Sequence, residues 1–127
     1  MELTKSEMEI MDVFWDADQP LSRSDLLERS TDKTWKDSSV HILLNGLLSK
    51  QAIHEAGFVK RNKTYGRVFV PSMSRESYFA NTIFGHPRQP QILGLMEELL
   101  KRPEVSEQTL DAFAALIAER RAELTPR

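Results

Sequence analysis

The clearest periodic pattern in the chain lies in residues 36–51, where large apolar side chains recur at helical spacing. On an α-helix, the side that this spacing would bury carries Val40, Leu43, Leu44, Leu47 and Leu48. The opposite side is small, polar and nearly uncharged, and it carries Ser38, His41, Ile42, Asn45, Gly46 and Ser49. Solvated helix surfaces usually mix Lys and Glu. The pattern therefore favours a helix whose outer side approaches the floor of a DNA major groove.

A first helix is predicted from about Lys5 to Ala17. Thr4 can cap it, and Glu7 follows three residues later, which is the spacing of a capping box. Apolar residues at helical spacing include Trp15, which we expect in the core because burial of its large ring is strongly favourable. The helix must end before Pro20, since the residue preceding a proline is disfavoured in the α region.

A helix-turn-helix is predicted next. Ser22 can cap a short helix that runs to about Ser30, and Asp37 is the expected cap of the helix in residues 36–51. Two short helices joined by a turn, the second with a clean outer side, are typical of this DNA-binding arrangement.

A β-hairpin is expected after these helices. Residues 53–60 and 64–70 are rich in β-branched and aromatic side chains, and Asn62 between them suits a tight turn. Added to the helices, the hairpin makes a winged helix. Arg61 and Lys63 at its tip would lie against backbone phosphates or enter a minor groove. Alternatively, the tip is charged only because it is exposed.

Three further helices are predicted from residue 74 onward, beginning near residues 74, 91 and 106. They carry more large apolar side chains than one small domain can cover, which favours a two-fold dimer. The chain is thus expected to be mainly α with a small β-hairpin. It would divide into a winged helix-turn-helix domain, residues 1–73, and C-terminal dimerisation helices, residues 74–127. The expected dimerisation residues are Tyr78, Phe79, Ile83, Ile92, Leu95, Met96, Leu99, Leu110, Phe113, Leu116 and Ile117.

The charge distribution agrees with one basic face. Residues 33–67 hold seven basic and two acidic residues, a formal charge of +5, whereas the whole chain of 127 residues has a net charge of −2. One third of the chain is therefore suited to phosphate, although chance clustering of solvated lysines gives the same count. No apolar run approaches the roughly 20 residues of a membrane span, and the acidic N-terminus is unlike a signal peptide. We expect a cytoplasmic protein without a membrane partner.

Catalysis is not expected. The chain has no cysteine, which excludes thiol redox chemistry and zinc-thiolate sites. Its histidines, His41, His54 and His86, do not have metal-ligand spacing, and no glycine-rich phosphate loop is present. We therefore predict no metal and no cofactor. The main alternative is a winged helix that binds another protein instead of DNA.

Three stretches resemble a known family of small dimeric winged-helix repressors: the penicillinase and methicillin-resistance repressors, with their copper-responsive relatives. LTKSEMEIMDVFW (residues 3–15) is similar to their first helix, and TWKDSSVHILLNGLLSKQAI (residues 34–53) to their recognition-helix segment. FVPSMSRESYF (residues 69–79) is similar to their exit from the wing. The resemblance covers roughly the whole chain. It implies dimeric operator binding and derepression of a neighbouring gene.

The chain also departs from this family. His41 and Gly46 stand where members commonly carry Arg, which removes two strong guanine or phosphate contacts that the resemblance would imply. Gly94-Leu95 stands where the penicillinase repressors have the Asn-Phe bond at which they are cleaved. The copper-responsive members bind metal through cysteine pairs, and this chain has none. The inducing signal, the operator and the regulated gene are not predicted.

The prediction is thus a dimeric repressor that binds a palindromic operator through its winged helix. Asn45 is the expected base reader, because its amide can pair bidentately with adenine. Ile42 would suit a thymine methyl, or else pack against the wing or a neighbouring helix. The residues expected to face the major groove are Ser38, Ser39, His41, Ile42 and Asn45, and those expected to hold the DNA backbone are Lys36, Lys60, Arg61 and Lys63.

Overall fold

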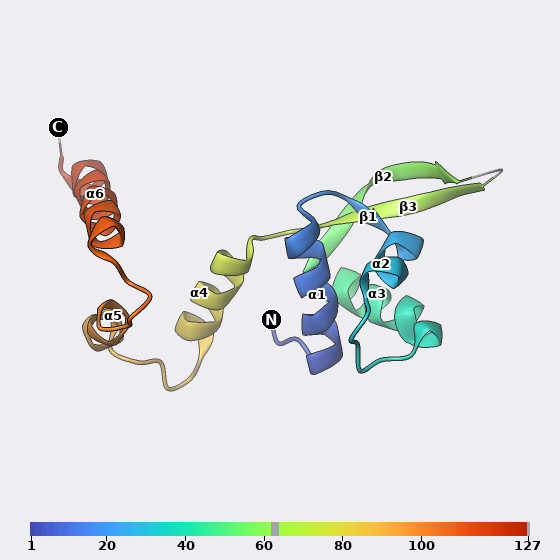
Figure 1. Cartoon of the computed structure of the whole chain (residues 1–127), viewed down its shortest axis with the longest axis horizontal. Helices are drawn as coiled ribbons and strands as arrows, with labels where there is room; N and C mark the ends of the chain where they lie inside the picture. The colour runs from blue at the N-terminus through green and yellow to red at the C-terminus, as the bar shows by residue number, and fades with distance from the viewer. Residues whose placement is uncertain (62–63, 127) are drawn as a thin grey trace. The chain divides into compact units, whose positions relative to one another are not determined.

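The computed structural model describes residues 1–61 and 64–126, and of residues 61, 64 and 65 it describes the backbone alone. The chain forms two compact units, Met1–Gly85 and His86–Arg127, which are described separately (Figure 1). The predicted functional division, residues 1–73 and 74–127, stays a prediction. The compact units divide after Gly85 instead, because the helix that follows the wing is anchored to the first unit.

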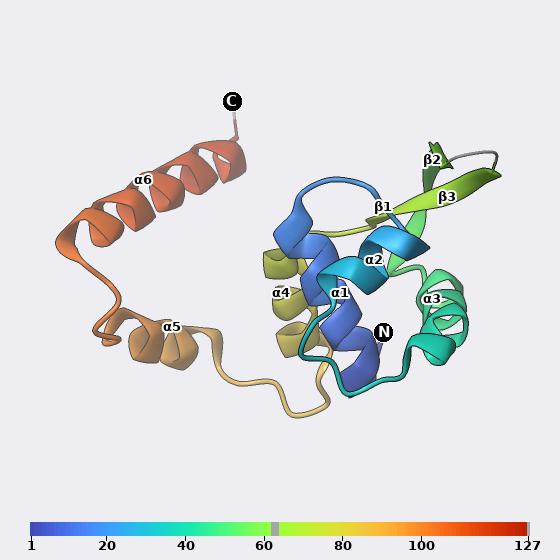
Figure 2. The same cartoon turned by 45° about the vertical axis from the view of Figure 1, so that its right-hand side comes forward.

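The first unit is a winged helix, as predicted. Its helices are α1 (Lys5–Ala17), α2 (Arg23–Arg29), a 3₁₀ turn η1 (Asp37–Ser39), α3 (Val40–Ser49) and α4 (Arg75–Gly85). Its strands are β1 (Leu21–Ser22), β2 (Ile53–Arg61) and β3 (Thr64–Pro71). Figures 1 and 2 show β2 and β3 extending beyond α1, α2 and α3 as a two-stranded ribbon.

The sheet has three antiparallel strands in the order β1-β3-β2, one more than the predicted hairpin. Leu21 pairs with Phe69 and Ser22 with Val68, so β1 connects the helix-turn-helix to the base of the wing. A strand of two residues has no detectable periodicity. Both of its residues are buried, and tertiary pairing alone creates it.

The core lies where α1, α2 and α3 meet the base of the sheet. The apolar stripe of α3 is confirmed, because Val40, Leu44 and Leu47 are buried and Leu43 and Leu48 pack on the core from its edge. The other buried apolar side chains are Ile10, Met11, Phe14, Leu21, Leu26, Trp35, Ala52, Ile53 and Phe69. Burial of such side chains stabilises a fold by roughly 1.5–3 kcal/mol each, so this small cluster holds α3 in place.

The helix starts follow the predicted cap chemistry with one exception. Capping boxes of Thr4 with Glu7 and of Ser22 with Asp25 open α1 and α2. Asp37, the expected cap of α3, instead begins η1, and α3 begins after Ser39 without a side-chain cap bond. A 3₁₀ turn is common at a helix N-terminus. The Asp37 carboxylate pairs with Lys33 at 2.6 Å.

The second unit contains α5 (Ile92–Leu100) and α6 (Glu107–Leu124), with Ser106 accepting a hydrogen bond from the Thr109 amide as the cap of α6. Both helices lie close to their predicted positions. Within residues 86–126 no side chain is buried. Several of the exposed side chains are large and apolar, which in soluble proteins is typical of interaction surfaces.

Candidate nucleic-acid interface

The outer side of α3 is open to solvent. His41, Asn45 and Ser38 are exposed, Ser39 is half-buried, and Ile42 is 75% exposed. Ile42 therefore does not pack against the wing or a neighbouring helix, so that alternative is wrong. The predicted exposure of these residues is therefore confirmed, except that Ser39 is only half-exposed. The assignment of these residues to DNA contacts stays a prediction.

Gly46, in contrast, does not belong to the outer side. A Cβ atom at this position would lie 2.8 Å from Oε2 of Glu7, so Gly46 faces the start of α1. The helical wheel places residue 46 at the edge of the outer side, and only the packing of α1 decides which way it faces. Glycine here leaves room for the Glu7 carboxylate.

Glu7 connects the start of α1 to the end of α3. Its buried carboxylate accepts hydrogen bonds from the Thr4 amide at 2.9 Å and from Lys50 Nζ at 2.5 Å. Burial raises the pKa of Glu7, but the hydrogen bonds from Lys50 and Thr4 outweigh it, so the pKa lies below the ordinary value of 4.5. Lys50 Nζ also donates to the Glu2 carbonyl. These bonds hold the C-terminal end of α3 on α1.

The loop before α3 is held by the same helix. The Thr34 amide donates a hydrogen bond to Oε1 of Glu9 at 2.9 Å, and the Thr34 hydroxyl donates one to Oε2 of Glu9 at 2.5 Å. These hydrogen bonds lower the pKa of Glu9. Trp35, the next residue, is buried, and Lys33 Nζ lies 5.1 Å from the centre of its ring. Both the loop before η1 and the end of α3 are thus positioned by α1.

Three of the four residues predicted to contact the DNA backbone lie in residues 60–63. Lys60 is exposed on β2. Arg61 pairs with Thr64 through the backbone, and Lys63 lies outside the described residues. The pairing register of β2 shifts between Glu55 and Gly57, and Gly57 has a φ of 131°. A β-bulge of this kind increases the twist of the ribbon.

Arg23 is a cation near α3 that the sequence analysis missed. It is the first residue of α2, it is exposed, and its Nη1 atom lies 2.5 Å from Nε2 of His41. The signal was present in the sequence, because a cap at Ser22 places residue 23 in the first turn of the helix-turn-helix. What the sequence did not reveal is that this turn meets the outer side of α3.

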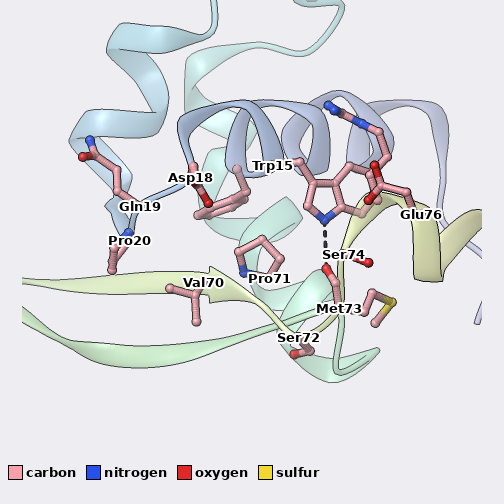
Figure 3. Close-up of a pocket in the computed structure, with 12 residues that line it drawn as sticks. Trp15, Asp18, Gln19, Pro20, Val70, Pro71, Ser72, Met73, Ser74 and Glu76 are labelled. Carbon is pink, nitrogen blue, oxygen red and sulfur yellow. Dashed lines mark hydrogen bonds between the residues drawn. The ribbon is translucent and has the colours of Figure 1, made fainter. Parts of the chain in front are cut away.

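The exit from the wing is held against the end of α1 (Figure 3). The Trp15 indole donates to the Met73 carbonyl at 2.9 Å beside a cavity of about 620 Å³. Arg75 bonds Asp16 at 2.8 Å and Asp12 at 3.3 Å, and its guanidinium carbon lies 5.3 Å from the Trp15 ring centre. The bonds to Asp16 and Asp12 raise the pKa of Arg75. These contacts fix the first turn of α4 on α1.

The predicted dimerisation residues fall into two groups. Tyr78 is half-buried, with its ring 5.8 Å from Trp15, so it already has a partner in the first unit. Ile83, Leu95 and Phe113 are half-buried. The remainder are exposed, and they are Phe79, Ile92, Met96, Leu99, Leu110, Leu116 and Ile117. Their role in a dimer stays a prediction.

The described part of the chain was also compared with the requirements of a metal site and of a membrane-spanning helix, and it meets neither. No group of three or more His, Asp or Glu side chains there could hold a metal ion. No helix there is both long enough and apolar enough to cross a membrane.

Comparison with known proteins gives one family. A family model described as penicillinase repressor matches residues 3–119, a range that spans the winged helix, α5 and most of α6. No curated protein matches the chain significantly.

Proposed function

Because the chain belongs to the penicillinase repressor family of DNA-binding transcriptional repressors, we propose that two copies bind a palindromic operator, one winged helix in each half-site. The family consists of repressors and not of enzymes. Operator DNA as the target makes the cytoplasm the proposed place of action.

The observation that carries this proposal is the exposed side of α3. Ile42 is a large apolar side chain that is 75% exposed in the middle of a helix whose neighbouring outer residues are small and polar. A major groove offers such a side chain the thymine C5-methyl group, and it offers the Asn45 amide the N6 and N7 atoms of adenine. Ser38, Ser39 and His41 complete the proposed groove surface.

Phosphate contacts are proposed on both sides of α3. Lys36 is exposed before η1, and Lys60 is exposed on the wing. We propose that both contact the DNA backbone, together with Arg61 and Lys63. Contacts of this type fix register and orientation, while the groove contacts select sequence. The ionic contribution makes affinity depend on salt.

The second unit supports the proposed dimer. Its nine large exposed apolar residues are Ile92, Leu93, Met96, Leu99, Leu100, Leu110, Leu116, Ile117 and Leu124. An identical surface from a second copy would cover them in a two-fold interface. Two linked winged helices then bind a palindrome more tightly than one, since the second half-site is bound at high effective concentration.

The test is a binding-site selection with the full-length chain, followed by a salt titration on the selected duplex. We expect a palindromic motif and a linear fall of log K with log salt, with a slope of about −0.9 for each phosphate contact. If no motif is selected and the chain does not bind duplex DNA, the protein-binding alternative replaces this proposal.

A further inference from the structure

We infer that Arg23 and His41 form a base-reading pair, in which Arg23 recognises a guanine in the major groove and His41 positions its guanidinium. This inference rests on the proposed operator binding and adds a specificity residue from outside the recognition helix. Arg23 comes from α2, whereas the proposed groove surface described above comes from η1 and α3.

The first argument is the lack of basic residues in η1 and α3. Residues 37–49 contain no Lys or Arg. Lys50, at the end of α3, donates to the buried Glu7 carboxylate, so it is turned toward α1. A surface that reads only through Ile42, Asn45 and small side chains lacks the Arg contact that discriminates guanine best. A guanidinium from a neighbouring element would supply it.

The position of Arg23 is the second argument. The residue before it, Ser22, is buried, pairs with Val68 in the sheet and caps α2 through the Asp25 amide. The backbone of Arg23 is therefore held by a strand, a capping box and a helix start together. Its side chain is exposed, and Nη1 reaches Nε2 of His41 in the first turn of α3. The guanidinium thus lies beside the outer side of α3.

Hydrogen-bond chemistry explains what the contact does. A guanidinium has five N–H donors and no acceptor, so Arg23 must donate and Nε2 of His41 must accept. The remaining donors are enough for a bidentate contact with O6 and N7 of guanine. Arg has a large rotamer entropy to lose on binding DNA. Holding its guanidinium against His41 before binding reduces that loss, which makes His41 a positioning residue.

The position of His41 relative to Asn45 predicts which base pair Arg23 would contact. His41 and Asn45 are four residues apart and both exposed, so they lie one above the other on the outer side of α3. Arg23 beside His41 and the amide of Asn45 would then contact neighbouring base pairs. The inference predicts a G·C pair near the A·T pair that Asn45 reads, once in each half-site.

The experiment is binding-site selection with the full-length wild-type chain and the variants Arg23→Ala, Arg23→Lys and His41→Ala. Arg23→Ala should lose the preference for one G·C pair per half-site, a preference we expect to be about tenfold or more in affinity. Arg23→Lys keeps the charge but not the planar fork, so it should lose most of the same preference. His41→Ala should weaken it and keep the adjacent A·T preference.

Arg29→Ala is the matched control, since it removes the same charge from the other end of α2 at another exposed position. It should leave the motif unchanged. A double-mutant cycle on the selected duplex should show that Arg23→Ala and His41→Ala together cost less than the product of their separate losses. Independent losses would contradict the positioning role of His41.

Other outcomes separate the two proposals. If the wild-type chain selects a motif and Arg23→Ala returns the same motif with a uniform loss of affinity, Arg23 contacts phosphate and this inference is wrong. If the wild-type chain selects no motif, the proposed operator binding is wrong and the inference falls with it. Thermal unfolding of each variant shows that its fold is retained.

Discussion

At the scale of single residues, Glu7 shows how a buried carboxylate can orient α3, the helix that we propose to read DNA. It is only 4% exposed, yet it is bonded to the chain at both the start of α1 and the end of α3. The pKa of Glu7 is lowered in the folded state. Its ionised form therefore stabilises the fold above about pH 4.5, and this contribution is lost as the pH falls through the lowered pKa.

Glu7→Gln should consequently destabilise the chain at pH 7 by about 1–3 kcal/mol, because Lys50 loses a charged partner in a partly buried site. Urea unfolding of wild type and variant at pH 7 and pH 3.5 measures this. The difference between them should shrink at the lower pH. A difference of equal size at both values would show that Glu7 acts by packing alone.

Gly46 gives a second prediction at this scale. An alanine in a helix interior usually stabilises it by about 1 kcal/mol relative to glycine. Here the added Cβ would lie 2.8 Å from Oε2 of Glu7, so Gly46→Ala should lose stability by displacing that carboxylate from Lys50. In a Glu7→Ala background the obstacle is gone, and the same substitution should stabilise. Chemical unfolding of the wild type, the two single variants and the double variant measures whether Gly46→Ala lowers or raises the stability in each background.

At the scale of elements, α1 organises the surface that we propose to meet DNA. Through Glu7, Glu9 and Trp15 it holds the end of α3, the loop before η1 and the chain leaving the wing. Arg75 extends this attachment to α4 through Asp12 and Asp16. In the proposed dimer, α4 connects the DNA-binding elements to the second unit, so its attachment would set the separation of the two half-sites.

Arg75→Met should therefore weaken binding to a two-half-site operator and leave binding to a single half-site unchanged. A loosened α4 spreads the orientations of the two winged helices without altering either reading surface. Arg102→Met, which removes an exposed ion pair with Glu104 in the second unit, is the matched control. Equal losses on both duplexes would mean that Arg75 contributes to the DNA contacts themselves.

At the scale of the whole molecule, two units of different character share the chain. The first has a buried core, and within its described residues α4 is attached by Trp15, Tyr78 and Arg75. The second has no buried side chain among residues 86–126. We propose that the same unit of a second copy of the chain covers its exposed apolar side chains.

A fragment of residues 1–85 should fold as a monomer, and a fragment of residues 1–73 should be less stable because it lacks the Arg75 and Tyr78 contacts. We expect the full chain to sediment as a dimer at micromolar concentration and to bind the operator far more tightly than either fragment. Sedimentation and thermal unfolding test this together. A full chain that sediments as a monomer would contradict the proposed dimer.

The sequence alone determined the approximate positions of the helices, the caps at Thr4 and Ser22, the apolar stripe of α3 and the two long strands. Each of these features depends on residues that are close together in the sequence. Such local patterns can be recognised without knowledge of the tertiary structure. The exposed outer side of α3 followed from the same periodicity, since burial of one side of the helix leaves the other free.

Only the tertiary structure decided which elements contact one another. It placed Arg23 beside His41, turned Gly46 toward Glu7, created β1 by pairing with β3, and joined α4 to the first unit. These features depend on contacts between residues far apart in the chain, whose approach is set by how the helices pack. A pattern read along the sequence contains the spacing within an element, but not the orientation of one element against another.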